Sequence, residues 1–465
     1  MANYQDLVID SAHPTGLGPG DVARSTTILA SGFLTLDGAA AYDTLISGAT
    51  AFLAASNGAA LSGTSVVGGG GLQVIAPNGV VDSTTLTGSG FFFLSGGTAS
   101  GTVLAGNCIE NLSSDAVDIG ARIDAGAIQD VFDATVSGAV LSGFGELVVW
   151  NDGTSRATAI SAGCQVLFSG AKAFDTVISA NGVQTVSSGA VAVGVKIENL
   201  GQQQILAGGV ASDVVMSSGT TEYQATFQLV EGTACHTVVY AFGDHYVRWG
   251  GVTYHSEIHD LAWQTVDAGG TASGTLIHSG GLQGIRGADP GYSAGAAYDT
   301  VVYSGGVQAV EGGYAERTTV HGNQNIWAAG SAVDNTICSG GWQIVWGSTT
   351  DTTVSSGGTQ TVCGTALRNT IRSGGTQVVQ RDGNAVKGGY ASGNALSSAL
   401  QWVEDSFTED NVLYGGSQIL QNGSATDNRL YQALQHVENA FVFSTLMVGG
   451  MQHCCCPFQN CLRAD

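Results

Sequence analysis

Proline and charged residues are both rare in this chain. Only 5 Pro occur in 465 residues, and charged residues make up 11%. Because no proline-rich or charged linker interrupts the composition, we expect no boundary between globular domains. Intrinsic disorder needs low hydrophobicity and high charge, whereas 43% of these residues are hydrophobic. The sequence therefore predicts a folded chain of one continuous architecture.

Basic residues are also scarce. The 14 Lys and Arg are outnumbered by 37 Asp and Glu, and the net charge of -23 would repel a nucleic-acid backbone or an anionic membrane. No apolar run approaches the roughly 18 residues that a membrane-spanning helix needs. Residues 1–7 lack the basic and apolar regions of a secretory signal peptide. We expect no nucleic-acid partner and no membrane-spanning segment, and export would have to use another signal.

Cysteine does not form a disulfide framework. Five of the nine cysteines are scattered singly, and the others are Cys454, Cys455, Cys456 and Cys461. Together with His453 these offer thiolate and imidazole ligands, but they lack the C-x₂-C spacing of structural zinc sites. A second group does not match the H-E-x-x-H motif, and its residues are His245, His255, Glu257 and His259. We predict no metal site and no cofactor.

Glycine, in contrast, is abundant, and its 70 residues punctuate a repeat. One copy is Thr353-Val354-Ser355-Ser356-Gly357-Gly358-Thr359-Gln360-Thr361-Val362. The glutamine gives the period, since intervals of 17 residues separate Gln343, Gln360 and Gln377, and also Gln401, Gln418, Gln435 and Gln452. Repeats built from a pair of helices need about 33 residues or more, so this period indicates β-structure.

Each copy has the chemistry of strands joined by tight corners. Short β-branched runs stop at a glycine pair, and glycine accepts the positive φ of a corner. One coil cannot bury its own apolar face, so it is stable only when another stacks about 4.8 Å away. We predict an all-β, single-stranded parallel β-helix of about 20 coils, with ladders of Gln, Asn and Thr. Residues 43–453 would form it, residues 1–42 an N-terminal lead or cap, and residues 454–465 a non-repeat, cysteine-rich tail.

Aspartate or asparagine often precedes the first strand of a copy. We interpret these residues as turn formers rather than catalytic groups. The pairs are Asp43-Thr44, Asp175-Thr176, Asp299-Thr300, Asn335-Thr336, Asp351-Thr352 and Asn369-Thr370.

The Ser-Gly-Gly-x-Gln-x-Val units resemble the strand-loop-strand repeats of AIDA-like autotransporter passengers, over about residues 40 to 453. The resemblance implies a right-handed β-helix, secretion through a C-terminal outer-membrane barrel, and bacterial cell-surface display. It further implies cell adhesion to a host or bacterial surface glycan or protein, or self-association. No run of roughly ten-residue amphipathic strands for such a barrel is recognised in this sequence.

In such families repeat serines can carry heptose. The matching positions here, each directly before a glycine pair, are Ser304, Ser339, Ser356 and Ser373. The alternative is that these four are ordinary turn residues.

The most aromatic stretch offers a possible glycan contact, because aromatic faces on a β surface can stack on sugar rings. The candidate residues are Tyr240, Phe242, Tyr246, Trp249 and Tyr254. Tyr223, Phe227 and Trp263 belong to the same stretch, and about half of the eight rings are expected to fill the coil interior.

Parallel β-helices also include polysaccharide lyases and glycosidases, so a carbohydrate-active enzyme is the alternative. Glycoside hydrolysis needs paired carboxylates roughly 5 to 9 Å apart. The dispersed Asp residues lie mostly at corners, and no Asn-Thr-Asp, Asp-Asp or Gly-His-Gly signature of pectinolytic enzymes is found. We therefore predict a non-enzymatic, adhesin-like passenger scaffold with no catalytic residue, located outside the cell.

Overall fold

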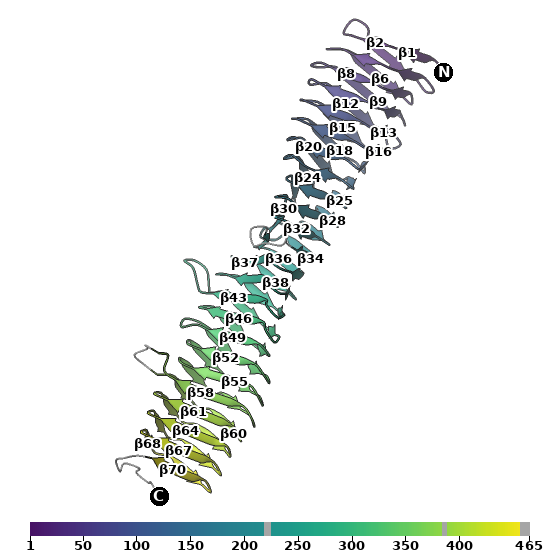
Figure 1. Cartoon of the computed structure of the whole chain (residues 1–465). Coiled ribbons are helices and arrows are strands. Elements are labelled where there is room, and N and C mark those ends of the chain that lie inside the picture. The colour runs from purple at the N-terminus through teal and green to yellow at the C-terminus, as the bar shows by residue number, and fades with distance from the viewer. Residues whose placement is uncertain (218–224, 384–387, 456–465) are drawn as a thin grey trace. The chain divides into compact units, whose positions relative to one another are not determined.

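The computed structural model describes residues 1–217, 225–383 and 388–455. They form two compact units, Met1–Cys235 and His236–Asp465. Each unit consists of strands that pair in parallel from one coil to the next (Figure 1). About 23 turns are present, and the described residues contain no helix. The predicted all-β parallel β-helix is confirmed.

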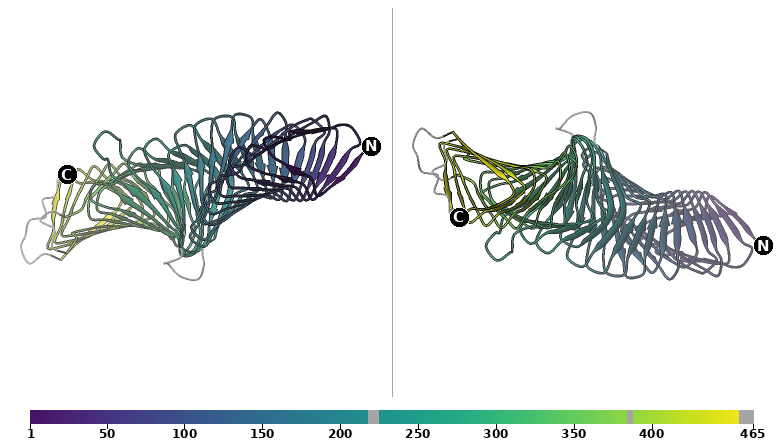
Figure 2. Two further views of the ribbon diagram at one scale, coloured as in Figure 1. Left: turned by 90° about the horizontal axis from the view of Figure 1, so that it is seen from above. Right: turned by 90° about the horizontal axis from the view of Figure 1, so that it is seen from below.

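A typical coil contains three strands, which we call first, second and third; in β34 (Val210–Ser217) and β36 (Thr233–Val239) the second and third are continuous. One coil consists of β40 (Trp263–Val266), β41 (Thr271–Ser273) and β42 (Leu276–Ile277). The next consists of β43 (Leu282–Arg286), β44 (Ala296–Tyr298) and β45 (Val301–Val302). Equivalent strands pair in parallel and in register, so that equivalent residues of successive coils lie side by side (Figure 2).

Other strands used below belong to the same ladders. In the second unit they are β36 (Thr233–Val239), β37 (Gly243–Val247), β38 (Val252–Tyr254), β39 (Glu257–Ile258), β46 (Val307–Glu311), β48 (Thr319–Val320), β52 (Trp342–Val345), β55 (Thr359–Val362), β58 (Thr376–Gln380), β67 (Leu434–Glu438) and β70 (Met451–Cys455). In the first unit they are β1 (Asn3–Gln5), β4 (Val22–Arg24), β7 (Ala40–Tyr42), β10 (Ala60–Ser62), β18 (Ile109–Ser113), β19 (Val117–Ile119) and β21 (Ile128–Phe132).

A column of glutamines runs through the interior, as the sequence predicts. Gln360 is fully buried, and its Nε2 donates to Gln343 Oε1 at 2.7 Å. In turn Gln377 Nε2 donates to Gln360 Oε1 at 2.8 Å. The same bond recurs between the next coils, from Gln418 to Gln401 and from Gln435 to Gln418, at 2.7 Å each. In these coils each amide has a partner one coil away, which is how the polar group is buried without losing its hydrogen bonds. Gln264 Nε2 is an exception, because His245 occupies the glutamine position of the preceding coil.

The glycine pair closes the corner between a third strand and the following coil. Gly305 has a φ of 82°, which side chains disfavour. Gly306 has no such φ, but a Cβ there would lie 2.7 Å from Ile277 O. The first glycine is thus required by backbone conformation and the second by the close approach of the preceding coil.

The predicted Asp and Asn turn residues occupy two different positions. Asp43, Asp175, Asp299 and Asp351 have φ values between 54° and 56°, at the corner between the second and third strands. Asn335 and Asn369 lie one residue later and are buried. Asn369 Oδ1 accepts a hydrogen bond from Thr352 N at 2.9 Å, so this asparagine joins two coils. Grouping all six residues as turn formers is wrong for these two.

The expectation that half of the aromatic stretch fills the interior is also wrong. Of its described members none is buried, and Tyr223 lies outside the described residues. Val, Ile, Leu and Ala supply the apolar interior, and Phe92 is the one aromatic side chain among the buried residues of the described part. A coil with one short strand on each side has room for these aliphatic side chains, so the larger rings lie outside.

Residues 1–42 contain β1, β4 and β7, which pair in parallel with one another; β7 continues to β10. The ladders therefore run without a break across residue 42, and the predicted division into cap, repeat domain and tail stays a prediction. At the other end β70 extends to Cys455, and the rest of the predicted tail, 456–465, lies outside the described residues. No helix of the described chain has the length and hydropathy to cross a membrane.

Candidate functional surface

The five predicted glycan-contact residues lie at different places around the coil. Tyr240 and Phe242 flank the corner between β36 and β37, and Tyr246 points outward from β37. Trp249 follows β37, and Tyr254 ends β38. The exposed fractions are 44% for Tyr240 and 43% for both Trp249 and Tyr254, so these three rings are open to solvent.

Two of the five share one arginine. The Arg248 guanidinium lies 3.6 Å from the ring centroid of Trp249 and 5.7 Å from that of Tyr246. The Tyr246 hydroxyl donates to Asp267, and burial together with this carboxylate raises the pKa of Tyr246. Trp249 also stacks with Tyr292 at 6.1 Å. Both aromatic rings are therefore engaged within the chain, whereas no such contact is recorded for Tyr254.

The four predicted glycosylation serines lie at equivalent positions of their coils. Each is exposed and occupies the corner that precedes the first strand of the next coil. A Cβ built at Gly357 would lie 2.7 Å from Ser339 Oγ, and one at Gly374 would lie 2.6 Å from Ser356 Oγ. Each of these hydroxyls thus lies against the glycine pair of the next coil. Ser339, Ser356 and Ser373 thus follow one another in successive coils, whereas His321-Gly322 occupies this corner in the coil that separates them from Ser304.

The same corner carries a column of rings that the sequence did not reveal. The residue directly after each third strand is aromatic or histidine in five successive coils, and we call these five the ring column: Tyr240, His259, His278, Tyr303 and His321. Ring centroids are 4.7, 4.3, 5.1 and 6.5 Å apart in that order. The rings stack because the backbone holds them in register: His278 N donates to Ile258 O at 2.8 Å, and Tyr303 N to Ile277 O at 2.9 Å.

One carboxylate lies against the middle of the ring column. Glu257 and His259 are two residues apart, so they project from the same face of the extended chain. His278 lies in the next coil, because Ile258 pairs with Ile277. Glu257 Oε2 is 3.4 Å from His259 Nε2 and 3.7 Å from His278 Nε2. Both Nε2 atoms are buried, and neither is in hydrogen-bond geometry with a described residue.

The electrostatics of this group favour a neutral imidazole at His259. Burial lowers the pKa of His259, and the neighbouring His278 lowers it further, while Glu257 opposes the shift. The side chains are partly accessible, with exposed fractions of 28% for His259, 34% for His278 and 42% for Glu257. The group can therefore meet a small solute while keeping both ring nitrogens available.

The sequence grouped these residues differently. It set Glu257 and His259 beside His245 and His255, which the structure places elsewhere. His245 is fully buried in the interior, and burial lowers its pKa to about 3. His255 is at another corner, where it stacks on His236 at 5.5 Å. The interval of 19 residues from His259 to His278, equal to the interval from Gln264 to Gln283, was the signal that could have joined the right pair.

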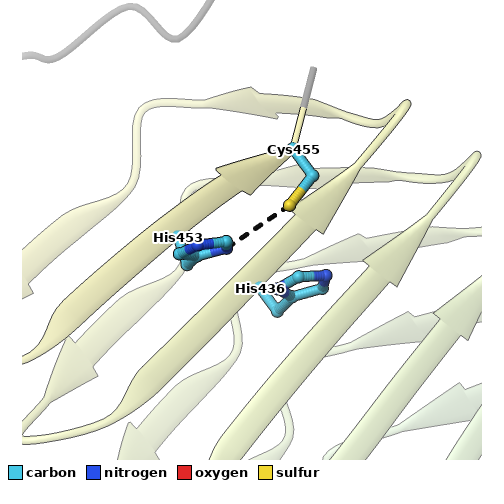
Figure 3. A group of neighbouring side chains, drawn as sticks. All are labelled: His436, His453 and Cys455. Carbon is cyan, nitrogen blue, oxygen red and sulfur yellow. Dashed lines mark hydrogen bonds between the residues drawn. The ribbon is translucent and has the colours of Figure 1, made fainter. Parts of the chain in front are cut away.

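A second group brings together residues near the end of the described chain. His436 of β67 is paired in register with His453 of β70, and their rings stack at 5.3 Å. Cys455 Sγ lies 3.5 Å from His453 Nδ1 (Figure 3). The three ligand atoms lie within 4.8 Å of one another. His453 and Cys455 are exposed, and the cysteines from Cys456 onward lie outside the described residues.

A pair of carboxyl groups is buried in the first unit. Glu110 of β18 and Asp118 of β19 each accept a hydrogen bond from Gln129 Nε2 of β21, at 2.8 and 2.7 Å. Burial raises the pKa of Glu110 well above its usual range and that of Asp118 to about 6. Both side chains are 0% exposed. A polysaccharide cannot reach them, so this pair does not supply the open carboxylates that glycoside hydrolysis requires.

Comparisons with known proteins find similarity among solved structures. No family model matches the chain, and no curated protein matches it. A solved structure of a TibA fragment, hyper-glycosylated in a reaction catalysed by TibC, is 31% identical. The alignment covers 61% of this chain and 93% of the fragment, with a TM-score of 0.46. This chain is similar to TibA.

Two other solved structures are much more distant. The PL6 family alginate lyase AlyGC is 9% identical, with 97% of this chain and 96% of the lyase covered and a TM-score of 0.19. A tailspike protein of E. coli bacteriophage HK620, in complex with a pentasaccharide, is 10% identical, with 89% of this chain and 72% of the tailspike covered and a TM-score of 0.15. Such scores carry no argument about activity. The burial of the Glu110 and Asp118 carboxyl groups, described above, does bear on it.

Proposed function

We propose that this chain is a non-enzymatic, adhesin-like passenger scaffold of the AIDA-like autotransporter type, displayed on a bacterial outer surface or secreted. The observation that carries the proposal is the corner after the third strand in the second unit, which carries rings in one run of coils, from Tyr240 to His321, and exposed serine hydroxyls at Ser304, Ser339, Ser356 and Ser373. A filled interior leaves the side of the coils as the binding surface, and repeat proteins use such extended surfaces for binding.

The proposed ligand is a glycan or protein on a host or bacterial surface. Tyr240 and Tyr254 are the strongest of the five contact candidates, because their rings are exposed and neither is covered by a cation. Trp249 is as exposed as these two, but its ring already contacts Arg248 and Tyr292, so less of its face is free to stack on a sugar. Phe242 and Tyr246 are half-buried, so they would contribute at the edges of such a contact.

The proposed modification is O-linked glycosylation of Ser304, Ser339, Ser356 and Ser373. Because the four serines occupy the same position in their coils, a glycosyltransferase would meet the same backbone conformation around each acceptor hydroxyl. A sugar on Ser304 would lie next to Tyr303 of the ring column, and sugars on the other three serines would extend the polar surface over the coils that follow it. Intact-mass measurement of protein from its native host tests this directly, since mass increments in whole hexose or heptose units are expected and an unmodified mass would contradict it.

Glycan-array and cell-binding measurements on the purified chain test the scaffold. Saturable binding is expected, and Tyr240→Ala with Tyr254→Ala should weaken it by about tenfold, which corresponds to about 1.4 kcal/mol. Trp402→Ala is the matched control, because Trp402 is also an exposed ring, at 39%, but lies outside the proposed contact. Release of reducing or unsaturated sugar ends from a polysaccharide panel would instead establish the carbohydrate-active enzyme.

A further inference from the structure

The group formed by Glu257, His259 and His278 lies in the middle of the ring column, and none of the three is among the proposed glycan-contact residues, although Tyr240 stacks on His259. Two coils supply it: Glu257 and His259 come from one, and His278 from the next. We propose that these three side chains bind a divalent transition-metal ion of the Zn²⁺ class, through Glu257 Oε2 and the Nε2 atoms of the two histidines.

The spacing of the ligand atoms fits such an ion. Zn²⁺ binds imidazole nitrogen and carboxylate oxygen at about 2.0–2.2 Å, so the edge of its tetrahedron is about 3.3 Å. The two measured oxygen–nitrogen distances are 3.4 and 3.7 Å, and all three ligand atoms lie within 4.8 Å of one another. Because the two imidazoles are stacked at 4.3 Å with an interplanar angle of 5°, coordination would require side-chain rotations that tilt the rings so that their nitrogen lone pairs converge on the ion.

The unsatisfied nitrogens are the second argument. Buried polar atoms nearly always have a partner, yet the Nε2 atoms of His259 and His278 have none in hydrogen-bond geometry among the described residues. Both nitrogens approach the same carboxylate oxygen. A cation between these three atoms would satisfy all of them at once, which one proton shared with Glu257 cannot do.

The scaffold holds the ligands in place before the ion arrives. Paired backbone strands fix the two histidine positions one coil apart, and Tyr240 and Tyr303 stack on the outer faces of the two imidazoles at 4.7 and 5.1 Å. Ring rotation is thereby limited, which reduces the entropy lost on binding. Three protein ligands leave one position of a tetrahedral ion for water or an external donor, and the net charge of -23 attracts cations to the surface.

Binding is tested by isothermal titration of the full chain with ZnCl₂. His453→Ala and serine at the four terminal cysteines, Cys454, Cys455, Cys456 and Cys461, first remove the other ligands that could take up zinc. One equivalent of Zn²⁺ is expected to bind. Glu257→Gln, His259→Ala and His278→Ala should each weaken binding at least tenfold. His321→Ala is the matched control, because this histidine belongs to the same ring column but has no recorded carboxylate partner, and it should leave affinity within about twofold.

A second readout distinguishes coordination from nonspecific attraction. Co²⁺ in place of Zn²⁺ should give visible d–d bands typical of four-coordination, and these bands should disappear in His278→Ala. Circular dichroism confirms that each variant keeps its β-structure, and Glu257→Gln preserves side-chain volume. Absence of saturable binding, or equal weakening by His321→Ala and His278→Ala, would overturn the proposal. Zinc binding that is weakened in the Glu257, His259 and His278 variants but kept in His321→Ala would establish the proposal. This result does not depend on the outcome of the glycan measurements.

Discussion

Removing one interior glutamine should weaken the second unit locally by a large amount. In Gln360→Ala, Gln377 Nε2 loses its acceptor and Gln343 Oε1 loses its donor, and both residues are fully buried. A buried polar group left without a partner costs about 1–3 kcal/mol, so the two together cost about 2–6 kcal/mol. Asn369 Nδ2, which donates to Gln360 Oε1 at 3.1 Å, also loses its acceptor.

Hydrogen–deuterium exchange resolved by peptide is the appropriate assay, because neighbouring coils of a repeat protein need not unfold together. Since about 1.4 kcal/mol is a factor of ten, amide protection in β52, β55 and β58 should fall by about 1.5 to 4 orders of magnitude. Gln360→Leu leaves the same two groups without partners but restores side-chain volume, so it separates the polar loss from the cavity. Thr359→Ala, on the outward side of the same strand, is the control.

The reasoning fails if Gln360→Ala reduces protection by less than about fivefold, or no more than Thr359→Ala does. Either result would mean that the hydrogen bonds of the glutamine column do not stabilise the fold. A loss in Gln360→Ala with none in Gln360→Leu would assign the stabilisation to packing rather than to the hydrogen bonds.

Three further predictions concern buried titratable groups and a corner. Because burial raises the pKa values of Glu110 and Asp118, the folded first unit binds protons more tightly than the unfolded chain does. Its free energy of unfolding in urea, compared with that of the Glu110→Gln, Asp118→Asn variant, should therefore be greatest below about pH 3.8 and should fall as the pH rises through about 6. The pH dependence that His245 contributes has the opposite sign. Burial lowers the pKa of His245 to about 3, so its contribution to stability is complete above about pH 6.5 and is lost as the pH falls. In acid unfolding curves His245→Gln should abolish this loss. The same substitution gives buried Gln264 Nε2 an acceptor and should raise the free energy of unfolding by about 1–3 kcal/mol near neutral pH, with no gain contradicting the idea. Gly306→Ala should lower the thermal midpoint, because its Cβ would lie 2.7 Å from Ile277 O, and an unchanged midpoint would show that the corner can open.

The fold was predictable because its cause is repeated along the chain. Glycine pairs and an interior glutamine return at intervals that are mostly 17 or 19 residues, so most coils repeat the same local geometry and have the same partner one coil away. Gln343, Gln360 and Gln377 could be placed in one ladder from their spacing alone. The error over Asn335 and Asn369 arose because a shift of one residue moves a side chain from a corner into the interior, and the sequence pattern does not mark that shift.

The ring column and its carboxylate were not predictable in the same way. Local spacing grouped Glu257 and His259 with His245 and His255, because residues close in sequence were assumed to act together. Strand pairing places His278 beside His259, in agreement with their interval of 19 residues, while the alternation of the strand sends His245 to the interior.

By itself, then, the sequence determined that the backbone winds into stacked parallel coils, since corner glycines, β-branched strands and ladder amides act through local conformation and nearest-neighbour hydrogen bonds. Tertiary structure decided which side chains of different coils meet on the outside. These side-chain contacts depend on the register between coils of unequal length. The register is fixed when the backbones of successive coils pair, and no single repeat determines it.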